Sequence, residues 1–268
     1  MDERRLHERR ASGTFEAQVY AFRPPNQAPA FAYVARGGRS RNEADVIESS
    51  VREWHHEVIA KIPGSRMIVV DDASTDTTGS ILARLADELP ELLVIRPPRR
   101  RGHGPSVCAG LRRADTEYVF HTDSDRQHVP SEFWMLWAER ETADFVMGVR
   151  RKRADGRLRS GISAAMRIAN AVVWQKWIRD ANCPFKLMRR AALVEVLARI
   201  PDGFFIPMVA VSLLARKMGF GVKEIPVTHM PRQTGTPSLR GPATWLWLAP
   251  RCVWEMVRLR CSRMRPEK

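Results

Sequence analysis

The sequence predicts an α/β protein with a single domain, in which a mainly parallel central sheet is flanked by helices. Its 268 residues are enough to bury a full core as one domain with a short extension. Short β-branched runs alternate with segments of helical periodicity, and this alternation is typical of a doubly wound sheet. Carboxylates follow two of the expected strands, at the edge where ligands bind in such sheets.

The expected elements follow one another without an internal repeat. Residues 67–71 form the first strand, because Met67-Ile-Val-Val-Asp71 is a short β-branched run that ends in carboxylates. Leu82, Leu85 and Leu89 have helical spacing, which places a helix over residues 77–89. The further elements are strands at 92–95, 118–122, 145–148 and 222–227, and helices at 106–113, about 160–179, 191–199 and 207–218.

The two ends of the sequence differ in composition from the middle. Residues 1–30 are charged and then rich in Pro and Ala, so we expect a flexible arm there and the domain over residues 31–240. Residues 241–268 form a basic tail that contains Trp245, Trp247 and Trp254. Tryptophan with arginine at this density suits a membrane interface, and packing against the domain is an equal alternative.

The amino-acid composition indicates which kinds of partner and which cellular compartment to expect. Lys and Arg number 44 against 30 Asp and Glu, and the net charge of +14 favours anionic partners without choosing among them. The four cysteines form no CxxC pair, so reduced thiols in a cytoplasmic protein are the simplest account. No signal peptide and no apolar stretch of membrane-spanning length is visible. We expect a cytoplasmic protein, at most peripheral on the inner face of the membrane.

Two adjacent aspartates end the first expected strand. Asp71 and Asp72 are followed by Ser74, Thr75 and Asp76. Small hydroxyl residues and Asp in this place can cap the next helix and can accept hydrogen bonds from a nucleoside. Capping by one of these residues is expected, but it does not explain two aspartates at a strand terminus.

A second acidic group follows the strand at 118–122. Asp123, Asp125 and Gln127 alternate along the chain, and in an extended segment alternate residues point to one side. Hard oxygen ligands with this spacing suit Mg²⁺ or Mn²⁺, which would bridge a diphosphate. An exposed acidic turn is the alternative, but the position after a strand in this α/β order favours a metal site.

Three motifs in this order resemble the signatures of family 2 glycosyltransferases. They are Val70-Asp71-Asp72 with Asp76, Arg101-Gly-His-Gly104, and Asp123-Ser-Asp125-Arg-Gln127-His-Val-Pro130. The resemblance covers roughly residues 40–240 and is nearest to the dolichol-phosphate (polyprenol-phosphate) mannose synthase-like enzymes. It implies the GT-A fold, a Rossmann-like nucleotide-binding domain. It also implies inverting transfer of a hexose, of the mannose or glucose type, from a GDP- or UDP-sugar.

The resemblance assigns a role to each motif. Asp123, Asp125 and Gln127 would hold the divalent metal on the donor diphosphate. Asp72 would lie in the nucleoside pocket, and glycines at 102 and 104 would let the backbone pass close to the donor. The substrate-binding residues expected on this basis are Asn42, Glu43, Asp71, Asp72, Asp76, Gly102, Gly104, Ser163, Arg232 and Ser238, and the catalytic residues are Asp125, Arg150 and Arg159.

The basic residues after Gly148 resemble the acceptor side of the same subgroup. Arg150 stands at a strand end that would meet the acceptor, and Arg159 and Ser163 are spaced to share one helix face, like an acceptor-phosphate clamp. Residues 180–186 resemble a D-x-x-(C/S)-G-F motif, with a proline at position 184 in place of the usual glycine.

A later segment resembles a loop that can close over the donor diphosphate. Residues 231–238, which contain Arg232 and Ser238, look like the family's R-x-x-G-x-S loop. The guanidinium of Arg232 would contribute charge-assisted contacts to the diphosphate.

Two departures from the family pattern bear on the substrates. The opening motif before Asn42 and Glu43 lacks the usual proline and contains additional Gly and Arg. Many members that glycosylate a hydroxyl carry a catalytic carboxylate before a late helix, whereas residues 204–209 contain no acid. A hydroxyl acceptor needs a base to remove its proton, but a phosphate monoester is already anionic. We therefore expect a polyprenyl phosphate as the acceptor.

Three alternatives stay open. The same chemistry on a soluble acceptor, such as a secondary metabolite or a peptide, is compatible with the lack of spanning helices. A nucleic-acid-binding module would explain the charge, but it leaves the aspartate clusters unexplained and lacks aromatic residues interleaved with basic ones, so no nucleic-acid partner is expected. A catalytically silent membrane-bound relative is disfavoured because Asp123 and Asp125 are intact.

Overall fold

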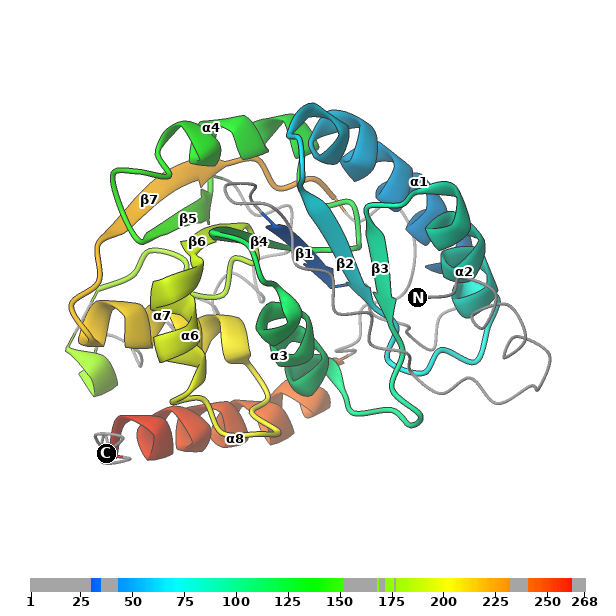
Figure 1. Ribbon diagram of the computed structural model, residues 1–268. Coiled ribbons are helices and arrows are strands. Elements are labelled where there is room, and N and C mark those ends of the chain that lie inside the picture. The colour runs from blue at the N-terminus through cyan, green and yellow to red at the C-terminus, as the bar shows by residue number, and fades with distance from the viewer. Residues whose placement is uncertain are drawn as a thin grey trace, which may run out of the picture.

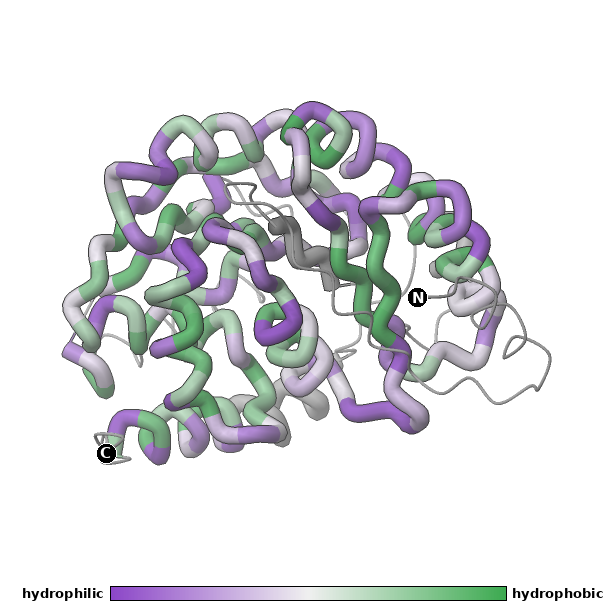
Figure 2. The backbone as a smooth tube through the Cα atoms, in the orientation of Figure 1, coloured by the Kyte–Doolittle hydropathy of each residue, from purple (hydrophilic) through white to green (hydrophobic). Residues whose placement is uncertain are grey.

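The structure is a computed structural model that describes residues 30–34, 43–151, 168, 172–175, 177–231 and 241–261. In these ranges a twisted central sheet lies between two layers of helices (Figure 1). This arrangement buries both faces of the sheet, which is why its strands are nearly continuous apolar runs, such as β2 and β3 in the middle of Figure 2.

The sheet has seven strands in the order β3-β2-β1-β4-β6-β5-β7. Their bounds are β1 (Ala30–Val34), β2 (Arg66–Val70), β3 (Leu92–Ile95), β4 (Tyr118–Asp123), β5 (Phe145–Arg150), β6 (Lys186–Arg189) and β7 (Val222–Val227). Strand β6 is antiparallel to both β4 and β5, and the other strand pairs are parallel. The carboxyl ends of β2, β1, β4 and β5 therefore reach the same edge of the sheet.

The helices divide between the two faces. Their bounds are α1 (Glu43–Glu57), η3 (Ile59–Lys61), α2 (Thr78–Glu88), α3 (His103–Arg113), η4 (Pro130–Glu132), α4 (Phe133–Ala138), α6 (Arg190–Leu197), α7 (Pro207–Lys217) and α8 (Gly241–Cys261). Helices α1, α2 and α4 contribute to one hydrophobic cluster, which contains Trp54, Phe120 and Phe133. Helices α3, α6, α7 and α8 contribute to the other.

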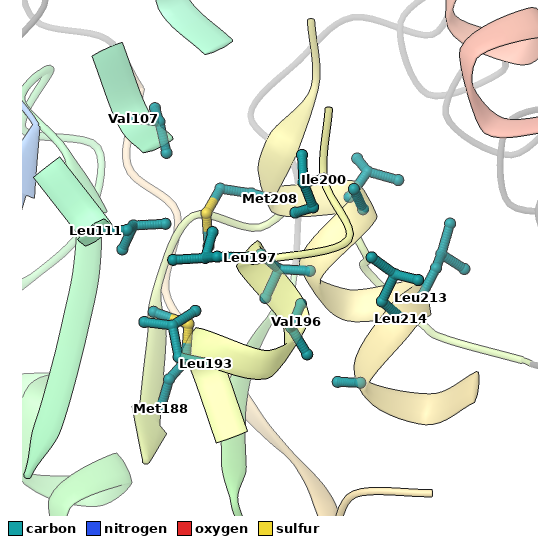
Figure 3. Packing of buried hydrophobic residues seen from close by; sticks show 14 of the residues in the cluster. Val107, Leu111, Met188, Leu193, Val196, Leu197, Ile200, Met208, Leu213 and Leu214 are labelled. Carbon is teal, nitrogen blue, oxygen red and sulfur yellow. The ribbon is translucent and has the colours of Figure 1, made fainter. Parts of the chain in front are cut away.

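The second cluster joins helices that are far apart in the chain. Val107 and Leu111 of α3 lie near Leu193 and Leu197 of α6, with Met208 of α7 close by (Figure 3). Burying a side chain of this size contributes about 1.5–3 kcal/mol, so this layer holds α3 against the sheet.

The predicted fold class is confirmed, with corrections at particular elements. Strands β1 and β6 were not predicted from the sequence, and the helix expected at 106–113 begins earlier, at His103. The helix expected at about 160–179 does not reach residue 179, because the helical residues end at Trp174 and Gln175 has a left-handed backbone with φ 51°. The first part of that helix, and the arm at 1–29, lie outside the described residues.

The basic tail forms a long helix on the domain. Helix α8 covers residues 241–261, and its Met256 and Leu259 are buried within the cluster of α3, α6 and α7. Packing against the domain, one of the two alternatives, is therefore observed for this helix. None of the helices in the described ranges combines the length and the apolar character that crossing a membrane requires.

Candidate active site

The turn after β2 is organised by its first aspartate. Asp71 is fully buried, and its Oδ1 accepts hydrogen bonds from the backbone N–H of Ser74 (2.9 Å) and from the Ser74 hydroxyl. Arg96, just after β3, donates to the carbonyl of Ser74 (2.7 Å) and lies 3.4 Å from Asp71 Oδ2. Ala73 has a left-handed φ of 54°, so the chain reverses within this turn. Asp71 therefore stabilises the conformation of the turn after β2.

The second aspartate connects two loops at the same edge of the sheet. Asp72 is 1% exposed, and its two carboxylate oxygens accept the backbone N–H groups of Arg101 (2.7 Å) and Gly102 (2.8 Å). These charge-assisted bonds hold the start of α3 beside the end of β2. We call residues 71–76 and 96–104 the β2–α3 region. The expected contact between Asp72 and a nucleoside stays a prediction. The hydrogen bonds of Asp72 to the 101–102 backbone could not be predicted from the sequence.

The two glycines of this region serve different purposes. Gly102 has φ 93° with open space around its Cα, so its value is conformational. A Cβ on Gly104 would lie 1.8 Å from the carbonyl oxygen of Phe204, so this glycine permits close packing of α3 on the 204–205 backbone. Packing within the protein thus accounts for Gly104 independently of any donor.

Asp76 has the local role that was expected of one polar residue here. It is exposed, and its Oδ1 accepts the backbone N–H of Thr78 (3.0 Å) in the first turn of α2. A carboxylate in this place satisfies one of the N–H groups that a helix start leaves open. The predicted substrate contact of Asp76 is untested.

The second acidic motif begins where β4 ends. Asp123 is the last residue of β4, and Asp125 and Gln127 follow in a bend in which Arg126 has φ 55°. The prediction that residues 123–127 are extended is therefore wrong beyond the first residue. The left-handed Arg126 turns the chain, and its side chain pairs with Glu53 (3.0 Å) on α1.

The acidic motif nevertheless has the chemistry of a site for a hard cation. Asp123 and Asp125 are both partly buried and supply carboxylate oxygens. Gln127 donates through Nε2 to the carbonyl of Met230 (3.1 Å), which leaves its Oε1 as the side-chain acceptor. Within the described residues no group of three or more His, Cys, Asp or Glu side chains is close enough to enclose a metal by itself. Two carboxylates and an amide oxygen are ligand types that Mg²⁺ or Mn²⁺ accepts, and the remaining ligands would have to come from outside these three side chains.

A buried ion pair lies beside this motif, at the end of β5. Arg150 donates through Nε (2.6 Å) and Nη2 (2.7 Å) to the two oxygens of Asp180, and the two side chains are 10% and 9% exposed. Burial opposes the charge of the guanidinium, but the hydrogen bonds from Asp180 outweigh it, so the pKa of Arg150 is raised. The charge of Asp123 acts in the same direction, which indicates that Arg150 lies within electrostatic reach of the acidic motif.

A fully buried lysine supports the segment that carries Asp180. Lys186 of β6 donates to the carbonyls of Ala181 (3.1 Å) and Cys183, and burial lowers its pKa to about 8. The hydroxyl of Ser212 on α7 donates to the same Ala181 carbonyl (3.0 Å). We call residues 145–150 and 180–189 the β5–β6 region. Its polar groups fix the 180–185 turn, and the turn fixes Arg150.

Two histidines stay uncharged next to this region. His121 of β4 lies against the carbonyl of Pro184 (2.9 Å), and His128 packs on Phe185 with ring centroids 5.1 Å apart. Burial lowers the pKa of each histidine to about 3. Neither imidazole is therefore charged at neutral pH.

Some of the predicted site residues lie close together in the structure, and others lie outside the residues that it describes. Asp71, Asp72, Gly102 and Gly104 form one connected group. The strand register places Val34, the last residue of β1, opposite Asp123, so β1 ends beside the acidic motif. Glu43 is the first residue of α1. The predicted site residues Asn42, Arg159, Ser163, Arg232 and Ser238 lie outside the described residues.

Three residues of the site were missed or given no role from the sequence. Arg96 directly precedes a Pro-Pro pair and carries no motif signal. Asp180 and Lys186 stand at the two ends of the 180–186 motif, whose pattern could have marked them as a pair that brackets a turn. Their partners could not be read from the sequence, because Arg150 precedes Asp180 by 30 residues.

Comparison with known proteins assigns the family. The model of the family described as glycosyl transferase family 2 matches residues 40–197, which is more than half of the 268 residues. The chain belongs to glycosyl transferase family 2. The predicted family and the enzyme class, glycosyltransferase, are thereby confirmed.

Curated relatives of this family 2 glycosyltransferase have names that refer to polyprenyl phosphates. The undecaprenyl-phosphate 4-deoxy-4-formamido-L-arabinose transferase of Photorhabdus laumondii is 30% identical over 63% of this chain, which spans 51% of that protein. The undecaprenyl-phosphate mannosyltransferase of Micrococcus luteus is 26% identical over 67% of this chain and 78% of its own length. The chain therefore spans about half the length of the first of these relatives.

Solved structures confirm the GT-A fold. Glucosyl-3-phosphoglycerate synthase from Mycobacterium tuberculosis, in complex with Mn²⁺, UDP-glucose and phosphoglyceric acid, has a TM-score of 0.59 at 17% identity and covers 87% of this chain and 80% of its own. A mannosyltransferase from Pyrobaculum calidifontis, in complex with GDP-Man and Mn²⁺, has a TM-score of 0.55 at 19% identity and covers 89% and 72%. At such identities the likeness concerns the fold alone.

Proposed function

We propose that this chain transfers a hexose, of the mannose or glucose type, from a GDP- or UDP-sugar to a polyprenyl phosphate, with inversion and with Mg²⁺ or Mn²⁺. The observation that carries the proposal is the position of Arg150. Its buried guanidinium lies at the end of β5, at the same edge of the sheet as Asp123 at the end of β4. A fixed cation beside an acidic metal motif suits a reaction in which two phosphorylated substrates must meet. The names of the curated relatives support a polyprenyl phosphate acceptor.

The metal would be held by Asp123, Asp125 and Gln127 with oxygens of the donor diphosphate. When bound, a divalent cation neutralises charge that develops on the departing nucleoside diphosphate. The protein supplies the rest of the cradle. Asp72 holds the 101–102 backbone against the end of β2, at the same edge of the sheet as the motif that follows β4.

Arg150 is prepared to bind a phosphate. Asp180 occupies Nε and Nη2, so the guanidinium is held in one orientation and Nη1 keeps donors for a further ligand. Little side-chain entropy is then lost on binding, which is the advantage of a preorganised donor. We assign this donor to the acceptor phosphate.

The transfer needs no protein base. An oxygen of the acceptor phosphate attacks the anomeric carbon, and the bond from that carbon to the donor diphosphate breaks, so the electron pair leaves with the nucleoside diphosphate. No proton has to be removed, because a phosphate monoester is already ionised. Residues 204–209 contain no carboxylate, and the carboxylate that contacts them, Glu255, is engaged by the backbone N–H of Phe205 (3.0 Å) and by Arg251 (3.3 Å).

The test measures nucleoside diphosphate release from a panel of GDP- and UDP-sugars, with Mg²⁺ or Mn²⁺, and with or without a short polyprenyl phosphate. We expect release that requires the metal and the lipid phosphate. Because a metal ligand contributes several kcal/mol of charge stabilisation, Asp125→Ala should lower the rate about a thousandfold. The matched control is Asp87→Ala, which removes an exposed aspartate of α2 and should leave the rate unchanged.

Two outcomes would contradict the proposal in different ways. Turnover with a soluble acceptor, such as a metabolite or peptide, but not with polyprenyl phosphate would replace the acceptor and keep the GT-A chemistry. Release that is equal in wild type and Asp125→Ala would contradict the metal site itself. Calorimetry of donor binding to each variant distinguishes loss of the metal site from loss of the folded structure.

A further inference from the structure

Helix α8 is anchored on the domain by one side only. Cys252, Met256 and Leu259 are buried, at the spacing that places them on one helix face. The helix is also held by Lys217, whose Nζ donates to the carbonyl of Arg260 (3.1 Å). Figure 1 shows α8 along one edge of the molecule, with nothing drawn beyond it on the outer side.

The opposite face of α8 is exposed and partly apolar. Its members in the described range are Pro250, Arg251, Trp254, Val257, Arg258 and Cys261, which we call the outer face of α8. Trp254 is 60% exposed and Val257 is 40% exposed. The guanidinium of Arg258 lies over the Trp254 ring, 5.3 Å from its centroid. Leaving a tryptophan of this size in water forfeits the gain from burying it, so a partner that covers it is favoured.

The charge of this face has one sign. The one carboxylate in α8 is Glu255, which is 13% exposed and bonded to the backbone N–H of Phe205 and to Arg251. The outer face therefore presents arginines with no carboxylate among them, in a chain whose net charge is +14. A positive face with tryptophan at its centre complements an anionic lipid surface, where an indole ring sits at headgroup level.

The outer face is connected to the candidate site through a short path. Glu255 holds the backbone of Phe205, and the adjacent carbonyl of Phe204 lies against Gly104 at the start of α3. The start of α3 is in turn bonded to Asp72. In Figure 1, α8 lies on the side toward which β2 and β3 run.

A second copy of the chain fits this face less well than a membrane does. A symmetric dimer pairs the same patch with itself, so Arg251 and Arg258 of one copy would meet the arginines of the other. Repulsion between like charges opposes such a contact, whereas anionic headgroups relieve it. The apolar part is also small, with two large apolar side chains flanked by arginines.

We propose that the outer face of α8 docks on an anionic phospholipid surface and thereby brings the site to the membrane that holds its lipid acceptor. The role of docking, which is to bring the enzyme to a lipid acceptor, rests on the proposed function. Docking itself requires neither the nucleotide-sugar donor nor the acceptor. Tryptophan and valine enter the interface, and the arginines contact lipid phosphates.

The test is flotation of the full chain with vesicles of phosphatidylcholine alone or mixed with phosphatidylglycerol, in the absence of substrates. We expect binding to the mixed vesicles only, and weaker binding as salt is added. Replacing both apolar residues, Trp254→Ser with Val257→Ser, should reduce binding about tenfold. Since each basic residue near an anionic surface contributes about fivefold, Arg258→Glu should reduce it at least that much.

Matched controls carry the same changes at the other side of the molecule. Met135→Ser removes an apolar side chain of α4 that is 37% exposed, and Lys61→Glu makes the same change in net charge as Arg258→Glu. Both should bind like the wild type. Melting temperatures should agree among all variants, because every replaced side chain is exposed.

Three results would overturn the proposal. These are no wild-type binding to the mixed vesicles, equal binding by the Trp254→Ser/Val257→Ser variant, and a dimer in solution that this variant abolishes. Hexose transfer to a short acceptor phosphate without vesicles separates the two claims. Lost docking with intact transfer is expected of the variant, whereas absent transfer in a wild type that docks contradicts the proposed function alone.

Discussion

The β2–α3 region and the β5–β6 region hold their polar residues in different ways. In the first, the carboxylates of Asp71 and Asp72 accept backbone N–H groups from their own turn and from a neighbouring loop. In the second, Arg150 pairs with Asp180, and Lys186 lies fully buried on two backbone carbonyls. One region uses charges to fix the backbone, and the other buries opposite charges together.

This difference determines how each region responds to change. The N–H groups of Arg101 and Gly102 lie in a loop that water can reach, so each finds another acceptor when the buried carboxylate of Asp72 is lost, and the cost is on the order of one hydrogen bond for each N–H. A buried charge that loses its partner keeps its full desolvation cost. The β5–β6 region should therefore be the more sensitive of the two, in stability as well as in substrate binding.

The largest expected effect is that of breaking the buried ion pair. Asp180→Ala leaves the guanidinium of Arg150 without its partner and should lower the free energy of unfolding by about 3–5 kcal/mol. The double variant Arg150→Met with Asp180→Leu removes both charges and should recover most of that stability, but not hexose transfer. Urea unfolding and the transfer assay together distinguish the two effects.

An exposed pair of the same residue types provides the control. Arg112 and Asp202 are 3.0 Å apart and 44% and 92% exposed, so Asp202→Ala should cost less than about 1 kcal/mol. Equal losses for Asp180→Ala and Asp202→Ala would show that burial does not govern the β5–β6 pair.

A smaller effect is expected from the glycines of the β2–α3 region. Gly104→Ala places a methyl group against the Phe204 carbonyl, so it should cost about 2–3 kcal/mol through displaced backbone. Gly102→Ala meets open space and should cost about 1 kcal/mol for its left-handed backbone. Thermal unfolding of the two variants measures the order, and a larger loss for Gly102→Ala would contradict the packing role of Gly104.

The smallest effect is a change in the pH dependence of stability. The pKa of His128 is about 3 in the folded protein, against 6.5 as the ordinary value. Between these values the unfolded chain binds more protons, so stability falls as the pH falls below 6.5, by up to about 1.4 kcal/mol per pH unit for each such histidine. His128→Phe should reduce the slope of unfolding free energy against pH by about that amount.

Two measurements locate the pH effect. His56→Gln changes a histidine whose side chain is 80% exposed and should leave the slope unchanged. Amide hydrogen exchange at pH 7 and pH 5.5 should show increased exchange around residues 180–186 before residues 71–76, because His121 and His128 pack beside the former. If exchange increased first in the β2–α3 region, the β5–β6 region would not be the more sensitive of the two.

The fold could be predicted where the signals are local. The strand at Met67–Val70 and the helix with Leu82 and Leu85 carry their own periodicity, and the acidic residues stand directly after strands. Strand β6 was missed because it has four residues and begins with a lysine, a residue that is almost never buried. The bend at Arg126 was missed because a left-handed arginine has no sequence signal.

The sequence by itself determined the alternation of strands and helices, the carboxylates at strand ends and the family to which the chain belongs. These features depend on neighbours within a few residues, and hydrophobic periodicity records them. The tertiary structure decided which residues became partners. Arg150 finds Asp180 across 30 residues, and Phe205 finds Glu255 across 50. Only the packing of the sheet and its helices brings such groups within hydrogen-bonding distance. Hydrophobic periodicity can therefore indicate which face of an element is buried, but not which residues contact that face.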